Sequence, residues 1–128
     1  MNKKINATAA TLGLLAIILG AFGAHALKNL LTTEQLSTFE TGVKYQMYHA
    51  LFLLFLALNT SLSNQSKKVI FYVIVIGVVL FSGSIYMLAT KSLTLINLKS
   101  VGIITPIGGL FLIVGWALFF IKTVRNNS

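Results

Sequence analysis

The chain has no cysteine and almost no acidic residues: its 128 positions include no aspartate and two glutamates, Glu34 and Glu40. Without cysteine it cannot form disulfides, zinc–cysteine sites, iron–sulfur clusters or a thiol nucleophile. Charged residues of both signs make up only 9% of the sequence, against about 25% in a typical soluble domain. Together with a hydrophobic content of 56%, this composition excludes both intrinsic disorder and an ordinary soluble fold.

Groups for acid–base or covalent catalysis are equally scarce. His25 and His49 are the only histidines, and the sequence has no serine–histidine–acid pattern, glycine-rich phosphate loop or catalytic pair of carboxylates. The two histidines and Glu40 are suitable ligand types for a metal, and two histidines could also hold haem iron. Their spacing favours neither alternative, so we expect no metal, no cofactor and no enzyme activity.

Ten lysines and arginines give the chain a formal net charge of +8, but they are scattered singly or in pairs. Nucleic-acid binding needs basic residues gathered on one face, so we expect no nucleic-acid partner. The basic residues instead flank four uncharged stretches, each near the roughly 20 residues that a helix needs to cross a bilayer. We therefore predict a single all-α domain over residues 1–128, an integral membrane bundle of four transmembrane helices with spans at about 5–27, 45–64, 69–90 and 101–121.

The segment before the second span has the features of a helix start. Thr32 and Gln35 form a capping-box pattern, and Thr33 is an equally acceptable N-cap. At helical spacing one face is apolar and contains Leu36, Phe39, Val43, Met47 and Leu54. The opposite, more polar face contains Thr38, Thr41, Gly42, Tyr45, Tyr48, His49 and Asn59. We predict a short amphipathic helix that either continues into the second span or bends near Gly42, with its apolar face on lipid or a neighbouring helix.

Small residues recur at helical spacing in the first and fourth spans. Such residues let two helix backbones approach closely, which is how membrane helices pack when lipid removes the hydrophobic driving force. The residues predicted to pack in this way are Ala9, Gly13, Ala16, Gly20, Gly23 and Ala24 in the first span and Gly102, Thr105 and Gly109 in the fourth. We expect this packing to be structural.

The distribution of basic residues predicts how the chain faces the membrane. With four spans, the N-terminus, the turn at Lys67 and Lys68, and the C-terminus share one side and carry six basic residues, against four on the other side. Both termini are therefore predicted to be cytoplasmic. Four aromatic residues, Tyr45, Tyr48, Tyr86 and Trp116, are assigned to the interface as anchors. An alternative for the N-terminus is a cleaved secretory signal peptide, which would leave three spans; the length of the first uncharged stretch favours a retained span.

Several motifs resemble a family of small bacterial membrane proteins catalogued as domain of unknown function 423. They are residues 20–27 (GAFGAHAL), 39–51 (FETGVKYQMYHAL), 81–86 (FSGSIY) and 104–109 (ITPIGG), followed by Trp116. Lys44 stands where the family pattern favours arginine, which keeps the charge but loses the bidentate fork. The resemblance implies a multi-pass protein of the bacterial cell membrane with a retained first span, and it implies no particular activity.

Five polar or aromatic residues are candidates for a functional cluster on the outer side of the membrane. They are His25, Glu40, Lys44, Tyr45 and His49. Polar groups at such a depth are costly unless paired, so they often have a role. The alternative is structural, in which each histidine caps a helix end or donates to a neighbouring carbonyl.

Two functions remain open from the sequence. The first is a structural or accessory helix bundle that acts through the lipid bilayer, membrane-protein partners or self-association as a homo-oligomer. The second is an oligomeric transporter or channel for a small solute or ion. Transporters usually place ionisable groups or broken helices near the membrane midplane, whereas here the middle of every predicted span lacks a charge. The first function is therefore the one we expect.

Overall fold

The computed structural model describes residues 1–93 and 98–125, and within them it contains helices and turns but no strand. The elements are α1 (Asn2–His25), α2 (Thr33–Leu58), α3 (Asn64–Ala89), a short 3-10 turn η1 (Lys91–Leu93) and α4 (Leu98–Arg125). The prediction of an all-α protein is confirmed.

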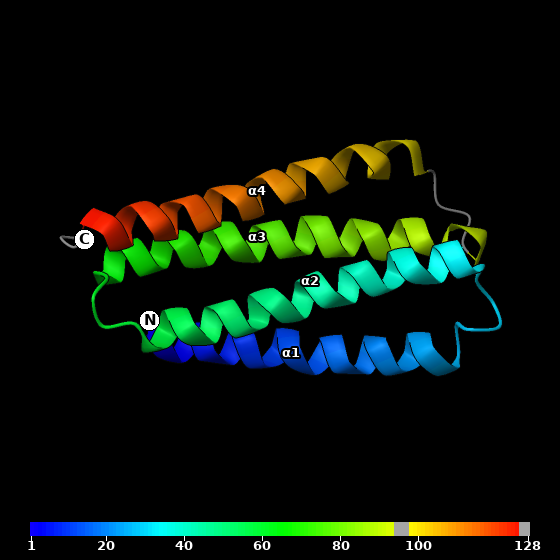
Figure 1. Cartoon of the computed structure of the whole chain (residues 1–128), viewed down its shortest axis with the longest axis horizontal. Coiled ribbons are helices and arrows are strands. Elements are labelled where there is room, and N and C mark those ends of the chain that lie inside the picture. Colours follow the sequence, from blue (N-terminus) through cyan, green and yellow to red (C-terminus); the bar gives the residue numbers. More distant parts are fainter. Residues whose placement is uncertain (94–97, 126–128) are drawn as a thin grey trace.

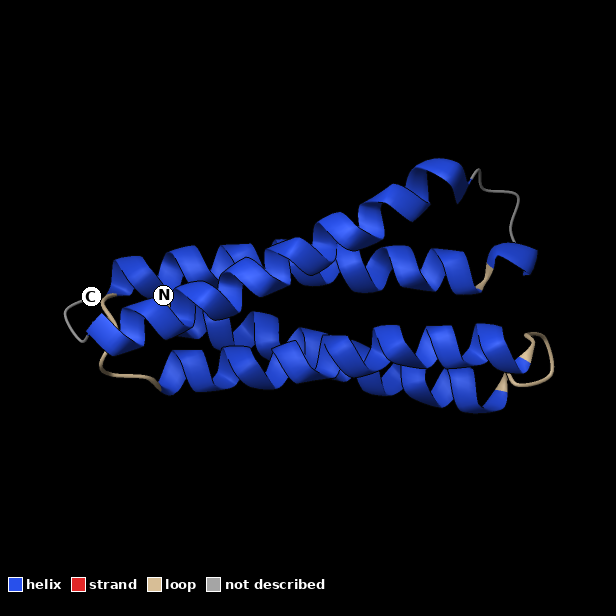
Figure 2. Ribbon diagram, turned by 45° about the horizontal axis from the view of Figure 1, so that its top comes forward, coloured by secondary structure: helices blue, strands red, loops and turns tan. Residues whose placement is uncertain are grey.

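The four helices run antiparallel and lie side by side in chain order (Figure 1). α1 packs on α2, α2 on α3, and α3 on α4. The start of α1, the end of α4 and the connection at 59–63 lie at the same end of the bundle, on the left of Figure 1. We call this the basic end, because it carries Lys3, Lys4, Lys67, Lys68, Lys122 and Arg125. Figure 2 shows that α4 diverges from α3 toward the opposite end.

Three of the helices are long and apolar enough to cross a membrane: α1, α3 and residues 100–125 of α4. α2 does not meet that description, because its first half carries Glu34, Glu40 and Lys44. From Tyr45 to Leu58 it is free of charge, but that part is only about 21 Å long. The hydrocarbon core of a bilayer is about 30 Å thick. Composition alone therefore supports three of the four predicted spans.

The second predicted span, residues 45–64, extends past the C-terminal end of the helix that contains it. α2 stops at Leu58, and residues 59–63 form a connection before α3 begins. The Asn59 side-chain oxygen accepts hydrogen bonds from the backbone N–H groups of Ser61 (2.8 Å) and Leu62 (2.9 Å). An asparagine bonded in this way stabilises a turn in competition with the helix, which explains why α2 ends here.

The capping box at the start of α2 is confirmed. The Thr32 hydroxyl accepts from the Gln35 backbone N–H (3.1 Å), and the Thr32 N–H donates to the Gln35 side chain (3.0 Å). Of the two predicted alternatives for the following segment, the structure has the continuous one: a single helix covers Thr33–Leu58 and does not bend near Gly42. Gly42 serves close packing instead: a Cβ there would lie 2.7 Å from the Tyr86 ring. Its carbonyl also accepts a hydrogen bond from Ser82 of α3 (2.8 Å).

The main hydrophobic core lies toward the basic end. It joins the first half of α1, the second half of α2, and α3, with Leu112 reaching in from α4. Its fully buried members include Ile5, Leu53, Leu56 and Ile74. A second, smaller core at the opposite end consists of Leu27, Leu31, Phe39 and Ala89.

The first-span residues predicted to pack mostly face α2. Ala16 is buried, a Cβ on Gly20 would lie 3.4 Å from Val43, and one on Gly13 would lie 3.8 Å from Ala50. Ala24 differs from the expectation, because it is exposed. Gly23, on the same predicted face, lies against the Phe39 ring (Cβ distance 3.1 Å).

In α4 the predicted packing residues differ from the observed ones. Gly109 lies beside the Phe81 ring, with a Cβ distance of 3.6 Å. Gly102 has no neighbouring atom within 4 Å of a Cβ, because α4 diverges from α3 there (Figure 2). The closest approach is at Gly108, where a Cβ would lie 2.8 Å from the backbone of both Leu80 and Phe81. Packing of Gly102 within the chain is thus a wrong prediction.

Candidate functional site

The five residues of the predicted polar cluster do not form one cluster. His25 is exposed at the C-terminal end of α1, and Glu40 and Lys44 are exposed on α2. His49 lies about 24 Å along α2 from the end where His25 is found, and about 13 Å beyond Glu40. The cluster was predicted at one depth on the outer side of the membrane, but the continuous helix α2 spreads its α2 members along and around the helix axis. Only Tyr45 and His49, which are one turn apart, are in contact.

His49 is buried within the bundle and has partners for both ring nitrogens. Nδ1 lies 2.7 Å from the Tyr45 carbonyl oxygen, and Nε2 lies 3.1 Å from the indole Nε1 of Trp116. A carbonyl only accepts and an indole N–H only donates, so Nδ1 carries the proton and Nε2 accepts. This is the neutral form of imidazole. Because both nitrogens are engaged, neither remains to ligate a metal or haem iron.

A second polar group links three helices near the middle of the bundle. The Gln46 side chain donates to the Leu12 carbonyl of α1 (2.8 Å) and accepts from the Tyr86 hydroxyl of α3 (2.7 Å). α3 and α4 are joined by a hydrogen bond between the hydroxyls of Ser84 and Thr105 (2.5 Å). Within residues 1–93 and 98–125, every buried side-chain nitrogen or oxygen has a partner. These hydrogen bonds satisfy the buried polar groups and link the helices to one another.

Two of the residues that build this interior were assigned to the membrane interface from the sequence. Tyr86 instead bonds to Gln46 and packs on Phe39, with ring centroids 5.1 Å apart. Trp116 lies about 13 Å from the C-terminal end of α4 and bonds to His49. The available signal was Gln46, an uncharged polar residue in a predicted span, because such a residue requires a partner on another helix. That signal did not identify the partner.

A groove lies between α2 and α4, and Phe81 of α3 contributes to its floor. It consists of two neighbouring cavities that share Trp116. One, of about 570 Å³, is lined by Tyr48, Leu51, Phe52, Phe55, Leu58, Asn59, Trp116 and Phe119. The other, of about 510 Å³, is lined by Tyr45, His49, Phe81, Gly109, Leu112, Ile113 and Trp116. We call the two together the α2–α4 groove.

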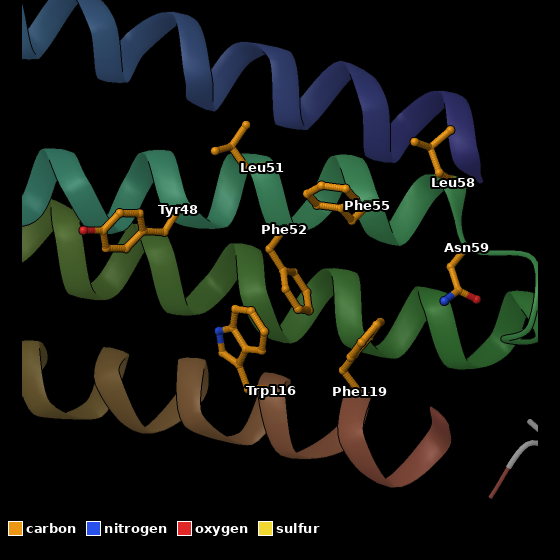
Figure 3. A pocket seen from close by; sticks show the side chains of 8 residues that line it. All are labelled: Tyr48, Leu51, Phe52, Phe55, Leu58, Asn59, Trp116 and Phe119. Carbon is orange, nitrogen blue, oxygen red and sulfur yellow. The ribbon is translucent and has the colours of Figure 1, made fainter. Parts of the chain in front are cut away.

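Aromatic side chains connect the two walls of the α2–α4 groove (Figure 3). The Phe52 ring of α2 lies between Trp116 and Phe119 of α4, with centroid distances of 4.4 and 5.4 Å. Tyr45 packs on Phe81 of α3, at 5.0 Å. The helix backbones of α2 and α4 stay apart, so these rings form most of the contact across the groove.

The α2–α4 groove suits an apolar ligand. Its lining is almost entirely hydrocarbon and aromatic, and each cavity falls within the range of about 300–1,000 Å³ typical of ligand pockets. The outer rim is open, since Phe55 and Leu58 are 70% and 73% exposed and Trp116 is 49% exposed. The arrangement can therefore bind hydrocarbon, and the one imidazole in its lining, His49, already has hydrogen-bond partners at both ring nitrogens.

Comparison with known proteins agrees with the membrane assignment. The family described as "Protein of unknown function (DUF423)" matches residues 19–109. A UPF0382 membrane protein of Haemophilus influenzae is 37% identical, and the alignment covers 100% of this chain and 99% of that protein. A UPF0382 membrane protein of Staphylococcus saprophyticus is 39% identical, with coverage of 88% and 89%. A UPF0382 inner membrane protein of Escherichia coli is 36% identical, with coverage of 91% and 86%. No solved structure matches. The chain belongs to the DUF423 family of bacterial membrane proteins, and its apolar helices contact the lipid bilayer.

Proposed function

We propose that this protein is a non-enzymatic accessory protein of the bacterial cell membrane, which works by binding a lipid acyl chain in the α2–α4 groove. The observation that carries the proposal is the groove itself, with two helices as walls, a third as floor and an open apolar rim. Inside a bilayer such a hollow is filled by hydrocarbon unless another protein covers it. The buried polar groups have partners already, so they do not call for a polar substrate.

The experiment uses Trp116, which is the only tryptophan in the chain and lies between the two cavities. The protein is reconstituted in vesicles whose phospholipids carry bromine on the acyl chains, which quenches tryptophan fluorescence on contact. The control is Leu14→Trp in a Trp116→Phe background, because Leu14 is 60% exposed on α1 at a similar depth. This control reports ordinary lipid contact.

If an acyl chain occupies the α2–α4 groove, Trp116 is quenched to about the same extent as the tryptophan at position 14. If the groove is closed by a second copy or a partner helix, Trp116 is quenched much less than the control. The second result would overturn the proposed function. It would favour self-association or a membrane-protein partner instead.

The proposal includes four membrane spans. α1 ends at one end of the bundle and α3 begins at the other, so α2 must run the full distance between them (Figure 1). α2 contains 26 residues, as many as α3. The charges of Glu40 and Lys44 lie on its exposed side, where long side chains can reach toward the interface. These facts support a crossing by α2 although its composition is less apolar.

We also propose that both termini are cytoplasmic. Six basic residues at the basic end against four at the other support this orientation. Because the chain has no native cysteine, single substitutions give a clean test. Ser61→Cys lies at the basic end and Ser92→Cys at the other, and both positions are exposed. In intact cells a membrane-impermeant thiol reagent is expected to label position 92 and not position 61; the reverse pattern would overturn the orientation.

Transport has less support than the accessory role. Gln46, His49 and Tyr86 are hydrogen-bonded within the bundle, so they form no free series of polar groups across it. A transporter or channel would have to form its pathway between several copies. Flux of common ions into liposomes that contain only this protein would favour that alternative.

A further inference from the structure

We infer that the α2–α4 groove selects an anionic phospholipid, with the acyl chain in the groove and the phosphate at the basic end beside Asn59, Lys122 and Arg125. The inference rests on the proposed function and adds the class of lipid. Four observations support it: the positive charge of the basic end, the length of the first cavity, the hydrogen-bond donors near Asn59, and the like charge that a second copy of the chain would bring.

The charges of the protein are separated along its axis. The basic end carries six lysine or arginine side chains and no acidic residue, because both glutamates lie on the half of α2 near the other end. One of the six, Lys67, is buried and donates to the Ala57 carbonyl at the end of α2 (3.3 Å). Basic pockets between membrane helices are a recurrent site for anionic headgroups.

The length of the first cavity of the groove matches one leaflet of the membrane. From Asn59 to Tyr48 the lining of the first cavity extends about 16 Å along α2. Half of a hydrocarbon core about 30 Å thick is about 15 Å. An acyl chain whose headgroup lies at Asn59 would therefore extend to the level of Tyr48 within a single leaflet. Figure 3 shows the side chains of this lining in order from Tyr48 to Asn59.

The mouth of the groove offers hydrogen-bond donors for a phosphate. The Asn59 oxygen is used by two backbone N–H groups, and the two hydrogens of its amide group take no part in those bonds. On α4, Lys122 follows the lining residue Phe119 by about one turn, and Arg125 follows Lys122 by another. Lys122 therefore lies close to the face of α4 that carries Phe119, and Arg125, about 60° further round the helix, lies at the same end of α4 in the headgroup region. Charge-assisted bonds from lysine and arginine are the strong ones for phosphate.

Charge also argues against a second copy as the occupant. In a parallel dimer, two basic ends with the same sign of charge would meet at the membrane surface, where like charges oppose association. An antiparallel dimer would place one basic end on the outer side, against the usual distribution of basic residues. An anionic lipid is complementary to the same surface.

The test compares two brominated lipids at a low mole fraction in vesicles of unbrominated phosphatidylcholine. The lipids are phosphatidylglycerol, which is anionic, and phosphatidylcholine, which is zwitterionic. Quenching of Trp116 gives the relative affinity of the groove for the two. We expect a preference of about fivefold or more for phosphatidylglycerol, since one basic side chain near a membrane surface contributes about that factor.

The variants locate the effect. Lys122→Gln with Arg125→Gln is expected to reduce the preference to less than about twofold, whereas Lys28→Gln with Lys91→Gln, at the opposite end, is expected to keep it. The tryptophan at position 14 in the Trp116→Phe background should report no preference. If it reports the same preference as Trp116, the lipid is enriched around the whole protein and the inference is wrong.

The remaining outcomes separate this inference from the proposed function. Equal and strong quenching of Trp116 by both lipids would overturn the headgroup selection and leave the acyl-chain site intact. Weak quenching by both lipids would overturn the site and the selection together. A preference that survives the double substitution on α4 would also overturn the inference, because the selecting charges would lie elsewhere.

Discussion

The contact between α3 and α4 at Gly108 offers the most direct test of how the bundle is held together. α4 packs on α3, and its closest approach to that helix is a contact between the Gly108 backbone and the backbone of Leu80 and Phe81. Gly108→Ala adds one methyl group at that contact. The same change at Gly102, in the same helix, meets no atom within 4 Å. The two variants therefore share one chemical change and differ in packing alone.

The expected magnitude follows from the distances. A Cβ on Gly108 would lie 2.8 Å from backbone atoms of Leu80 and Phe81, and still closer to the Phe81 nitrogen. Carbon atoms prefer separations of about 3.5–4.0 Å, so the helices would have to move apart by about 1 Å. Backbone cannot rotate out of the way as a side chain can, which places the cost near the upper end of about 1–3 kcal/mol for overpacking. Alanine gains about 1 kcal/mol over glycine in a helix.

The net expectation is a loss of about 2 kcal/mol in the free energy of unfolding for Gly108→Ala. For Gly102→Ala we expect no loss and a gain of up to about 1 kcal/mol. The assay is unfolding in detergent micelles, followed by circular dichroism for the whole chain and by Trp116 fluorescence for the separation of α4. If both variants unfold alike, the close approach at Gly108 does not stabilise the bundle and the reasoning is refuted.

Three further predictions concern α1 and α2. Ala16→Leu should lower the detergent unfolding midpoint clearly, because Ala16 is buried toward α2, whereas Leu15→Ile on the exposed face should have little effect; equal midpoints would contradict the observed packing of α1. His49→Ala should cost about 1–3 kcal/mol by leaving the indole N–H without its acceptor, while exposed Glu40→Ala should stay within about 0.5 kcal/mol, and detergent unfolding distinguishes the two. Thr32→Ala removes the capping box and should cost about 1 kcal/mol, measured in the same way; an unchanged midpoint would show that α2 does not need its cap.

The start of α2 shows how far local sequence can be trusted. Thr32 and Gln35 act within one turn, so their pattern contains all the information that the cap requires, and it is confirmed. Gly42 carries no such local information. Glycine is compatible with a bend and with a close contact, and the deciding group is the Tyr86 ring of α3.

The candidate site was less predictable than the fold. His49 was recognised as a polar residue within a span, but its partner Trp116 lies 67 positions away. Spacing on one helix reports which residues share a face, and it does not report which face of another helix lies opposite. For the same reason Gly102 and Gly108 could not be distinguished by sequence, although only Gly108 meets α3 closely.

The sequence by itself determined that this protein resides in a lipid bilayer and that its fold class is all-α. Membrane spans are indicated by the hydrophobic composition, the scarcity of charge and the length of the uncharged stretches. These features suffice because the free energy of transfer from water to lipid depends on the side chains of each segment alone. Tertiary structure alone decided the α2–α4 groove, the pairing of His49 with Trp116, and the exposure of Glu40 and Lys44 on α2. These features depend on how the helices are rotated and tilted against one another. That arrangement is set by packing between side chains on different helices, through contacts that no single helix encodes.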